Sequence, residues 1–351
     1  MKKNLFVLIL LCVISVINVN AGVNPAMRKE YDFKSFNEIR TVSRRQSLSG
    51  RGRYVTSSYK ISLVKSDHYK VVMEVWNRDD IDLFEVRRVG NTVELVTAIK
   101  KYPYHSKAED PCATVTIYTP EFPRVTLSGT SRMSVSGGAF SGDELSVTLS
   151  GVAKIDGLSG TWNRANITMS GTARMDNLTL KSGACYLTCS GVAEIAGVSS
   201  IYSDKVQLSM SGVTSIEMDN IYSGLANVTS SGASRLKSLE FNARELIADL
   251  SGTSSVKFVG KIDKISAEMQ GASSLSLNGN GNEVTVSASG TSTLNAKNFT
   301  VKDASLKLSG VAGATVTVTE KLETETSGNS HIDYYGNPKT VNNKSNNVVK
   351  H

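Results

Sequence analysis

A Ser-Gly dipeptide that returns about every twenty residues constrains the fold of this chain more than any other feature. The glycines lie 18 to 22 residues apart, and serine precedes each of them except Gly271. They are Gly129, Gly151, Gly171, Gly191, Gly212, Gly232, Gly252, Gly271, Gly290, Gly310 and Gly328. Self-similarity at a fixed period of this length is typical of a repeat architecture, and it covers more than half of the 351 residues.

The residues around each glycine repeat as well. A small residue (Ser, Ala or Thr) always lies two positions after the glycine, and an apolar residue lies four positions after it. Before the glycine, apolar and polar residues alternate, as in Val147-Thr148-Leu149. Alternation with period two predicts a strand on each side of the glycine. The glycine itself permits a turn conformation or a close backbone approach that a Cβ would forbid.

Such a unit could belong to an array of antiparallel hairpins or to a solenoid of parallel coils. The uniform columns favour the solenoid, because stacked coils place identical offsets beside each other. One coil buries too little apolar surface to be stable alone, so its stability depends on its neighbours. We therefore predict an all-β fold, a parallel β-helix (solenoid) of about ten coils of about 20 residues. The crossover preference of parallel strands predicts a right-handed helix.

Residues 1–21 have the features of a secretory signal peptide. Lys2 and Lys3 precede an apolar run from Leu5 to Ile17, and Ala21 provides a small residue for cleavage. The run is too short for a membrane span, and no later segment is apolar enough to cross a bilayer. We expect an exported protein, in the periplasm or at the cell surface, with no transmembrane segment.

The rest of the chain divides into three parts. Residues 22–120 are predicted to form a β-rich N-terminal part, either continuous with the solenoid or a separate capping sheet. Its apolar alternations predict strands over residues 32–39, 59–64, 69–75, 83–89, 92–98 and 113–118, and a loop over 100–111. The clear repeats occupy residues 121–336. Residues 337–351 form a polar tail that becomes either a last coil or a disordered segment.

The mature chain has three cysteines, Cys112, Cys185 and Cys189. The last two fall on the inward face of one predicted strand, about 13 Å apart, which is too far for a disulfide. We interpret them as buried thiols that fill space in the core. They lack the neighbouring histidines or carboxylates of a metal site.

Two outward columns are candidate ligand-binding surfaces. Three residues before the glycines lie Thr148, Thr168 and Thr188, within a longer column of hydroxyl side chains. This column could contact a glycan, although Ser and Thr are also ordinary residues on an exposed sheet. Three residues after the glycines lies a line of three cations, Arg132, Lys154 and Arg174; Glu194 and Ser215 then interrupt this column, and it resumes at Arg235. That line suits acidic sugars or phosphates, and the alternative is a solvated basic edge that prevents sheet-to-sheet association.

Composition and spacing argue against an enzyme. A polysaccharide lyase on a β-helix would need clustered carboxylates and a basic residue on long loops, but these coils differ little in length. Asp79, Asp80 and Asp82 do cluster, in what reads as a short solvated turn, and no serine, cysteine and histidine arrangement suggests a triad. The net charge of +7, or +5 without Lys2 and Lys3, is too mild to indicate nucleic acid binding.

Three motifs together resemble a known family. They are Phe36-Asn37-Glu38-Ile39, tandem Leu-Ser-Gly-Thr-Ser units, and a closing Tyr-Tyr-Gly-Asn-Pro at residues 334–338. The chain resembles the head GIN domain family of autotransporter-type adhesins from Gram-negative, Bacteroidetes-like bacteria, over about residues 33–345. The resemblance implies a β-helix similar to pectin lyases but without their catalytic residues, and a role in cell adhesion. It supplies no catalytic motif.

We therefore expect a non-catalytic, exported binding protein, a cell-surface adhesin that recognises a polysaccharide or a protein and uses no cofactor. Its partners would be a host or envelope glycan, another protein, or further copies of itself. The alternative is a structural scaffold of the envelope in the periplasm, and a polysaccharide lyase is less favoured.

Overall fold

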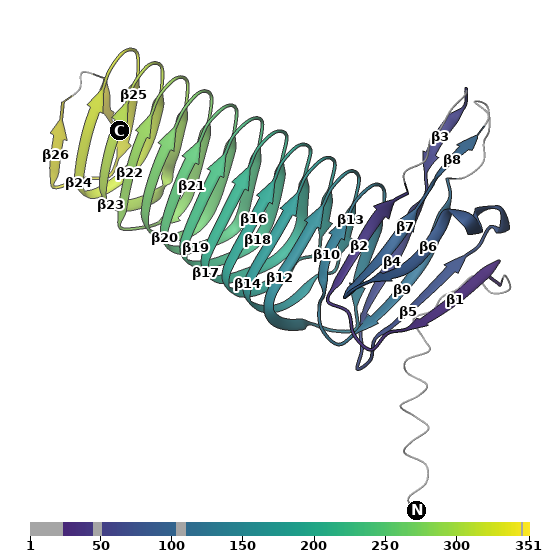
Figure 1. The fold of residues 1–351 in the computed structure, drawn as a ribbon. Helices are drawn as coiled ribbons and strands as arrows, with labels where there is room; N and C mark the ends of the chain where they lie inside the picture. The colour runs from purple at the N-terminus through teal and green to yellow at the C-terminus, as the bar shows by residue number, and fades with distance from the viewer. Residues whose placement is uncertain (1–23, 45–50, 103–109, 345–346) are drawn as a thin grey trace, which may run out of the picture.

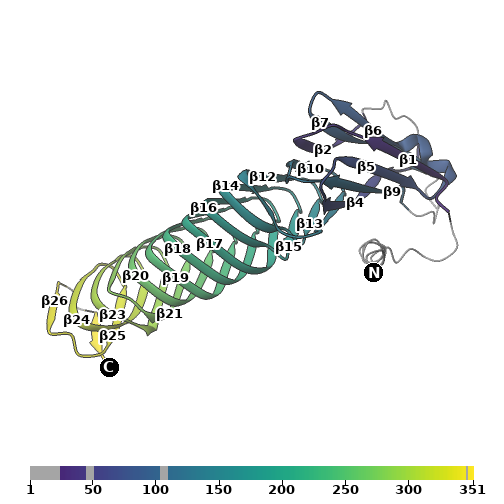
Figure 2. The same cartoon turned by 90° about the horizontal axis from the view of Figure 1, so that it is seen from below.

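The computed structural model describes residues 24–44, 51–102, 110–344 and 347–351. The predicted signal peptide lies outside these residues. The molecule is a long rod of stacked coils with a β-rich cap at its N-terminal end (Figure 1). Figure 2 shows the same rod from below, with the long strands of successive coils side by side.

The rod is a parallel β-solenoid of about eleven turns, which confirms the predicted fold class. In the early coils each glycine corner is followed by a short strand and then a long one, and from β17 onward these two usually merge into one bent strand between successive corners. The strands are β10 (Arg124–Leu127), β11 (Arg132–Ser136), β12 (Phe140–Leu149), β13 (Lys154–Asp156), β14 (Ser159–Met169), β15 (Arg174–Asp176), β16 (Thr179–Cys189), β17 (Glu194–Met210), β18 (Ser215–Ser230), β19 (Arg235–Leu250), β20 (Ser255–Met269), β21 (Ser274–Asn280), β22 (Glu283–Ala288), β23 (Thr293–Leu308), β24 (Gly313–Thr326) and β25 (His331–Tyr335).

Identical offsets pair in register from coil to coil. Val147 pairs with Ile167, and Ile167 pairs with Leu187 on the next coil. The small residues two positions after the glycines and the apolar residues four positions after them are all buried. Cys185 and Cys189 are buried free thiols on the inward face, as predicted. The solenoid core is therefore a set of continuous columns, each built from one offset of the repeat.

The corner glycines stack directly on one another. Each has a positive φ, between 68° and 81°, which favours glycine. A Cβ on Gly191 would lie 2.8 Å from the carbonyl oxygen of Gly171, so the corner has no room for a side chain. The same carbonyl accepts a hydrogen bond of 2.7 Å from the amide of Val192. Conformation and close stacking thus both require glycine here.

The N-terminal cap extends both walls of the solenoid. On one wall the order of paired strands is β10, β2, β7 and β6. On the other wall the order is β11, β4, β9, β5 and β1. A separate two-stranded antiparallel sheet of β3 and β8 projects from the cap (Figure 1). The cap elements are β1 (Met27–Asp32), β2 (Glu38–Ser43), β3 (Arg53–Thr56), β4 (Ser58–Lys65), β5 (Lys70–Val75), the 3-10 helix η1 (Arg78–Leu83), β6 (Phe84–Val89), β7 (Thr92–Thr97), β8 (Ile99–Tyr102) and β9 (Cys112–Thr119).

Three predictions for the cap were wrong. The expected strand over residues 32–39 is interrupted, because β1 ends at Asp32 and β2 begins at Glu38. The expected loop over residues 100–111 begins with the end of strand β8, which pairs with β3. Asp80 is not in a solvated turn but is 4% exposed in η1, where its carboxylate pairs with the ammonium of Lys100. In each case a long-range partner decides the conformation.

The polar tail forms a last, partial coil. Strand β26 (Thr340–Asn343) pairs in parallel with β24, and β27 (Val348–Lys350) pairs with β25. Of the two alternatives for residues 337–351, the structure shows the ordered one for the part of the tail that it describes.

A buried ion pair network holds the cap strands together. The Glu94 side chain is 3% exposed, and its carboxylate accepts hydrogen bonds from Arg40 on β2 and Arg87 on β6. Burial raises the pKa of Glu94, but the hydrogen bonds from Arg87 and Arg40 outweigh it, and the pKa lies below its ordinary value. The ionised form is therefore favoured in the folded state.

This network predicts how stability depends on pH. Since the folded pKa of Glu94 is depressed, its contribution is present above the unfolded pKa of about 4.3 and is lost as pH falls through the folded pKa. We expect Glu94→Gln to lower the free energy of unfolding by about 1–2 kcal/mol at neutral pH, and to lose less stability than the native protein on acidification. Denaturant unfolding at a series of pH values measures this, with exposed Glu217→Gln as the control. Parallel pH profiles for the native protein and Glu94→Gln would contradict the assignment.

Candidate functional site

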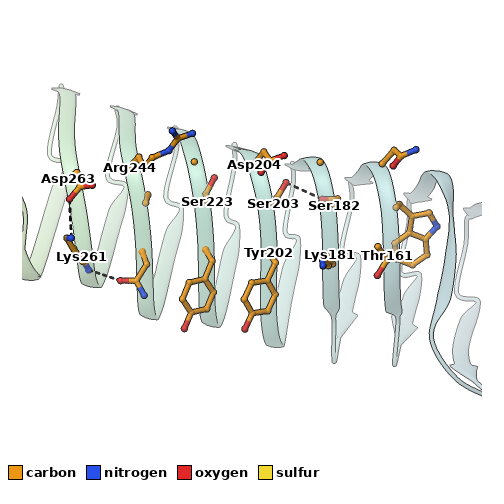
Figure 3. Close-up of a pocket in the computed structure, with 17 residues that line it drawn as sticks. Thr161, Lys181, Ser182, Tyr202, Ser203, Asp204, Ser223, Arg244, Lys261 and Asp263 are labelled. Carbon is orange, nitrogen blue, oxygen red and sulfur yellow. Dashed lines mark hydrogen bonds and ion pairs between the residues drawn. The ribbon is translucent and has the colours of Figure 1, made fainter.

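A groove runs along the wall of the solenoid over six consecutive coils, from β14 to β20. It extends from Thr161 to Asp263 and has a volume of about 900 Å³. At the usual spacing of neighbouring strands, six coils span about 24 Å. The volume is in the range of ligand-binding sites in proteins, and the groove is open to solvent along its length. Figure 3 shows its side chains, which come from equivalent offsets of successive coils.

The floor of the groove follows from one column of small residues. Ser182, Ser203, Ser223 and Ala243 pair in register on β16 to β19. The same column continues with bulky, buried residues at both ends, Trp162 on β14 and Ile262 on β20. Small side chains between two bulky ones leave the wall hollowed at these coils. We call this column the serine floor.

Two tyrosines form one side of the groove. Tyr202 on β17 and Tyr222 on β18 pair in register, and their rings are parallel within 2°, with centroids 4.8 Å apart. Tyr202 is 46% exposed, although a large aromatic side chain is more often covered. Tyr202 and Lys181 lie on the same side of the groove (Figure 3). The rings stack on each other, and the stacked pair is exposed to solvent mainly at Tyr202.

Neighbouring polar groups fix the orientation of one ring. The hydroxyl of Tyr222 donates a hydrogen bond of 2.8 Å to the Glu240 carboxylate, which also accepts one from the Asn242 amide. The hydrogen bond to Glu240 raises the pKa of Tyr222 above its ordinary value, so the phenol stays protonated at neutral pH. The Tyr222 ring is thereby held in place before any ligand arrives.

Charged groups of both signs border the groove. Lys181 lies in the same column as Tyr202 and Tyr222. On the other side, the Arg244 guanidinium lies over Gly224, because a Cβ on Gly224 would be 2.8 Å from its Nη2 atom. Asp204 lies on β17, one coil before Gly224 and two coils before Arg244. Within the described residues these three side chains make no ion pair or side-chain hydrogen bond. In contrast, Lys261 pairs with Asp263 at 3.6 Å.

The predicted hydroxyl column has the expected register. Thr148 pairs with Thr168, and Thr168 pairs with Thr188. Their side chains face outward and are half-buried or exposed. Whether this column contacts a glycan stays a prediction.

The predicted cationic column is also in register, but it is partly neutralised. Arg132 pairs with Lys154, and Lys154 pairs with Arg174 on the next coil. Asp176, two residues after Arg174, forms ion pairs with Lys154 at 2.6 Å and with Arg174 at 2.9 Å, and Glu194 pairs with Arg174 as well. These ion pairs reduce the positive charge that the column can offer to an anionic ligand. Arg132 has no ion pair among the described residues.

Sequence reasoning missed the groove, although a signal was present. The tripeptide Ile-Tyr-Ser occurs at residues 201–203 and again at residues 221–223. Each tyrosine lies ten residues before the next corner glycine, Gly212 or Gly232. Equal offsets predict stacked tyrosines, but the hollow beneath them depends on the packing of four coils together.

The described residues contain no cluster of three or more His, Cys, Asp or Glu side chains that could hold a metal ion. No helix among them is long and apolar enough to span a membrane.

The resemblance drawn from the sequence is confirmed over part of the chain. Residues 222–338 match the model of the family described as "Putative auto-transporter adhesin, head GIN domain". This segment includes Tyr222, Asn242 and Arg244 of the groove, whereas Tyr202 lies before it. No curated protein matches the chain in sequence.

Several solved structures are similar to the chain over most of its length. A "putative adhesin" from Parabacteroides merdae ATCC 43184 has 12% identity and a TM-score of 0.29, with 93% of this chain and 95% of that chain covered. A "putative lipid binding protein" from Parabacteroides distasonis ATCC 8503 has 12% identity and a TM-score of 0.27, with 93% and 97% covered. A "putative adhesin" from Bacteroides fragilis NCTC 9343 has 14% identity and a TM-score of 0.25, with 92% of each chain covered.

Proposed function

From the match of residues 222–338 to the head GIN domain family, we propose that this chain is an exported, non-catalytic binding protein of the adhesin type. It would act at the cell surface and recognise a polysaccharide or a protein. The observation that supports the proposal is the open groove with its stacked tyrosine pair, of which Tyr202 is 46% exposed and available for contact with a ligand. Ionisable groups border this groove at intervals and do not converge on one point, as general acid and base groups would.

Surface labelling of intact cells tests the location that this function requires. A membrane-impermeant amine reagent, followed by mass spectrometry, should modify exposed lysines such as Lys307, whose side chain is 68% exposed, without permeabilisation. Added protease should also cut the protein on intact cells, while a periplasmic marker remains whole. Labelling and cleavage only after permeabilisation would overturn the surface location and favour a periplasmic scaffold.

The cationic column gives a separate prediction about ligand charge. We expect Arg132→Ala/Lys154→Ala/Arg174→Ala to reduce the binding of acidic glycans on an array at low salt, mainly through Arg132, because Asp176 already neutralises the other two. High salt should remove the same component, since exposed charges are screened. Arg235→Ala, in the same column beyond its interruption, is the matched control. Equal binding of acidic glycans by the native protein and the triple variant would show that this column is not a binding site.

A further inference from the structure

We infer that the groove binds a stretch of a polysaccharide chain that runs along the solenoid axis, with sugar rings packed against Tyr202 and Tyr222. The inference rests on the proposed binding function and names the class of ligand and its site. The groove begins at β14, two coils after β10, which pairs with the cap, and it is separate from the threonine and cationic columns described above.

The tyrosine pair offers the apolar half of such a site. One face of a pyranose ring carries mainly C–H groups and packs on a flat aromatic ring, whereas its hydroxyls point to the sides. Tyr202 and Tyr222 stack on each other with centroids 4.8 Å apart, so a sugar ring would pack on an outer face of the stack, and Tyr202 is 46% exposed. Because Glu240 holds the Tyr222 hydroxyl, ordering that side chain costs little entropy on binding.

The other groups of the groove supply the polar half. A sugar chain has many hydroxyls, each of which both donates and accepts hydrogen bonds, so a glycan site needs donors and acceptors together. The side chains of Lys181 and Arg244 are donors without a partner among the described residues. The Asp204 carboxylate is an acceptor that likewise has no partner among them. They lie on the two sides of the serine floor, within the lining of one groove.

The shape of the groove favours a chain over a single sugar and over a polypeptide. Its length of about 24 Å, from the spacing of six strands, is enough for several sugar residues. A peptide that adds to a sheet needs a free strand edge, but the groove lies in the middle of the rod, where β16 to β19 are all paired on both sides.

Glycan binding by the purified exported protein tests this inference. The probes are hexamers of β-1,4-linked glucose, of N-acetylglucosamine and of galacturonate, each compared with its monomer by isothermal titration. We expect at least one hexamer to bind at least tenfold more tightly than its monomer. Tyr202→Ala/Tyr222→Ala should weaken that hexamer at least tenfold, and most of the native affinity should survive in high salt because ring packing is not ionic.

Two variants make the result specific to the groove. Tyr186→Ala removes a tyrosine from another outward column one coil earlier, and it should bind the hexamer as the native protein does. Tyr222→Phe keeps the ring and removes only the hydrogen bond to Glu240, so a loss of about threefold or less is expected. Thermal melting of every variant checks that the solenoid is intact, which we expect because Tyr202 and Tyr222 are at the surface.

Three outcomes would overturn the inference. The first is native affinity for the hexamer in the double tyrosine variant, and the second is an equal loss in Tyr186→Ala. The third is a native protein that binds none of the hexamers, or that binds a protein ligand through the tyrosine pair instead. If surface labelling succeeds while these tests fail, the adhesin-type function stands without this site. If the hexamer binds but labelling fails, the site stands and the surface location does not.

Discussion

Replacing Gly191 with valine is expected to lower the free energy of unfolding by about 4 kcal/mol or more, a loss at the upper end for single substitutions. Two costs add at this corner. The φ of 74° is a left-handed conformation that a β-branched residue rarely adopts. The new Cβ would also lie 2.8 Å from the Gly171 carbonyl oxygen, so neighbouring coils would have to separate. Chemical or thermal denaturation followed by circular dichroism measures the loss.

Two glycines separate the cost of conformation from the cost of stacking. Gly129 starts the column of corners, with a φ of 70° but no atom within 4 Å of an added Cβ. Gly129→Ala should therefore show only the conformational cost of about 1–2 kcal/mol, and Gly191→Ala should exceed it. Outward-facing Thr188→Val should change stability by less than about 0.5 kcal/mol. Equal losses for the two alanine variants would mean that close stacking contributes nothing.

The second large effect is on thiol reactivity. Burial raises the pKa of both Cys185 and Cys189 to about 12, so at pH 8 only about one thiol in ten thousand is ionised. Both side chains are also shielded, at 0% and 1% exposure. We expect a thiol-specific reagent to label them at least about a thousandfold more slowly in the native protein than in denaturant, since an unfolded cysteine has a pKa of about 8.5.

The third mature cysteine provides the internal reference. Cys112 is half-buried at the start of β9 and should react well before the other two in the absence of denaturant. Peptide mapping after timed labelling distinguishes the three sites. If Cys185 and Cys189 react at the rate of Cys112, the inward and outward faces of β16 have been assigned the wrong way round.

The repeat region could be predicted because one local pattern fixes both the turn and the register. The glycine corners, the buried small residues after them and the inward cysteines all follow from offsets to the nearest Ser-Gly. Strands β4, β5, β6, β7 and β9 of the cap were also predicted, within one or two residues at each end, from their alternation. In these segments the side chains that decide the structure are close in sequence.

The features that escaped prediction depend on partners far apart in the chain. Asp80 is buried because Lys100 reaches it across the cap, and the cationic column is neutralised because Asp176 contacts two coils at once. The groove likewise arises from four small residues on four coils, between Trp162 and Ile262. In each case the short stretch of sequence around the residue resembles an ordinary polar surface segment, so it does not predict the arrangement.

Register along the rod also determines how this architecture can change over generations. Because every coil presents the same corner to the coil before and after it, one coil could be duplicated or deleted without disturbing the others. Such an event would lengthen or shorten every column by one residue and leave each inward face inward. A hollow such as the one above the serine floor could then move, widen or close by gene-level copying of about twenty codons. Substitution of single side chains would still be needed to refine what the new surface contacts.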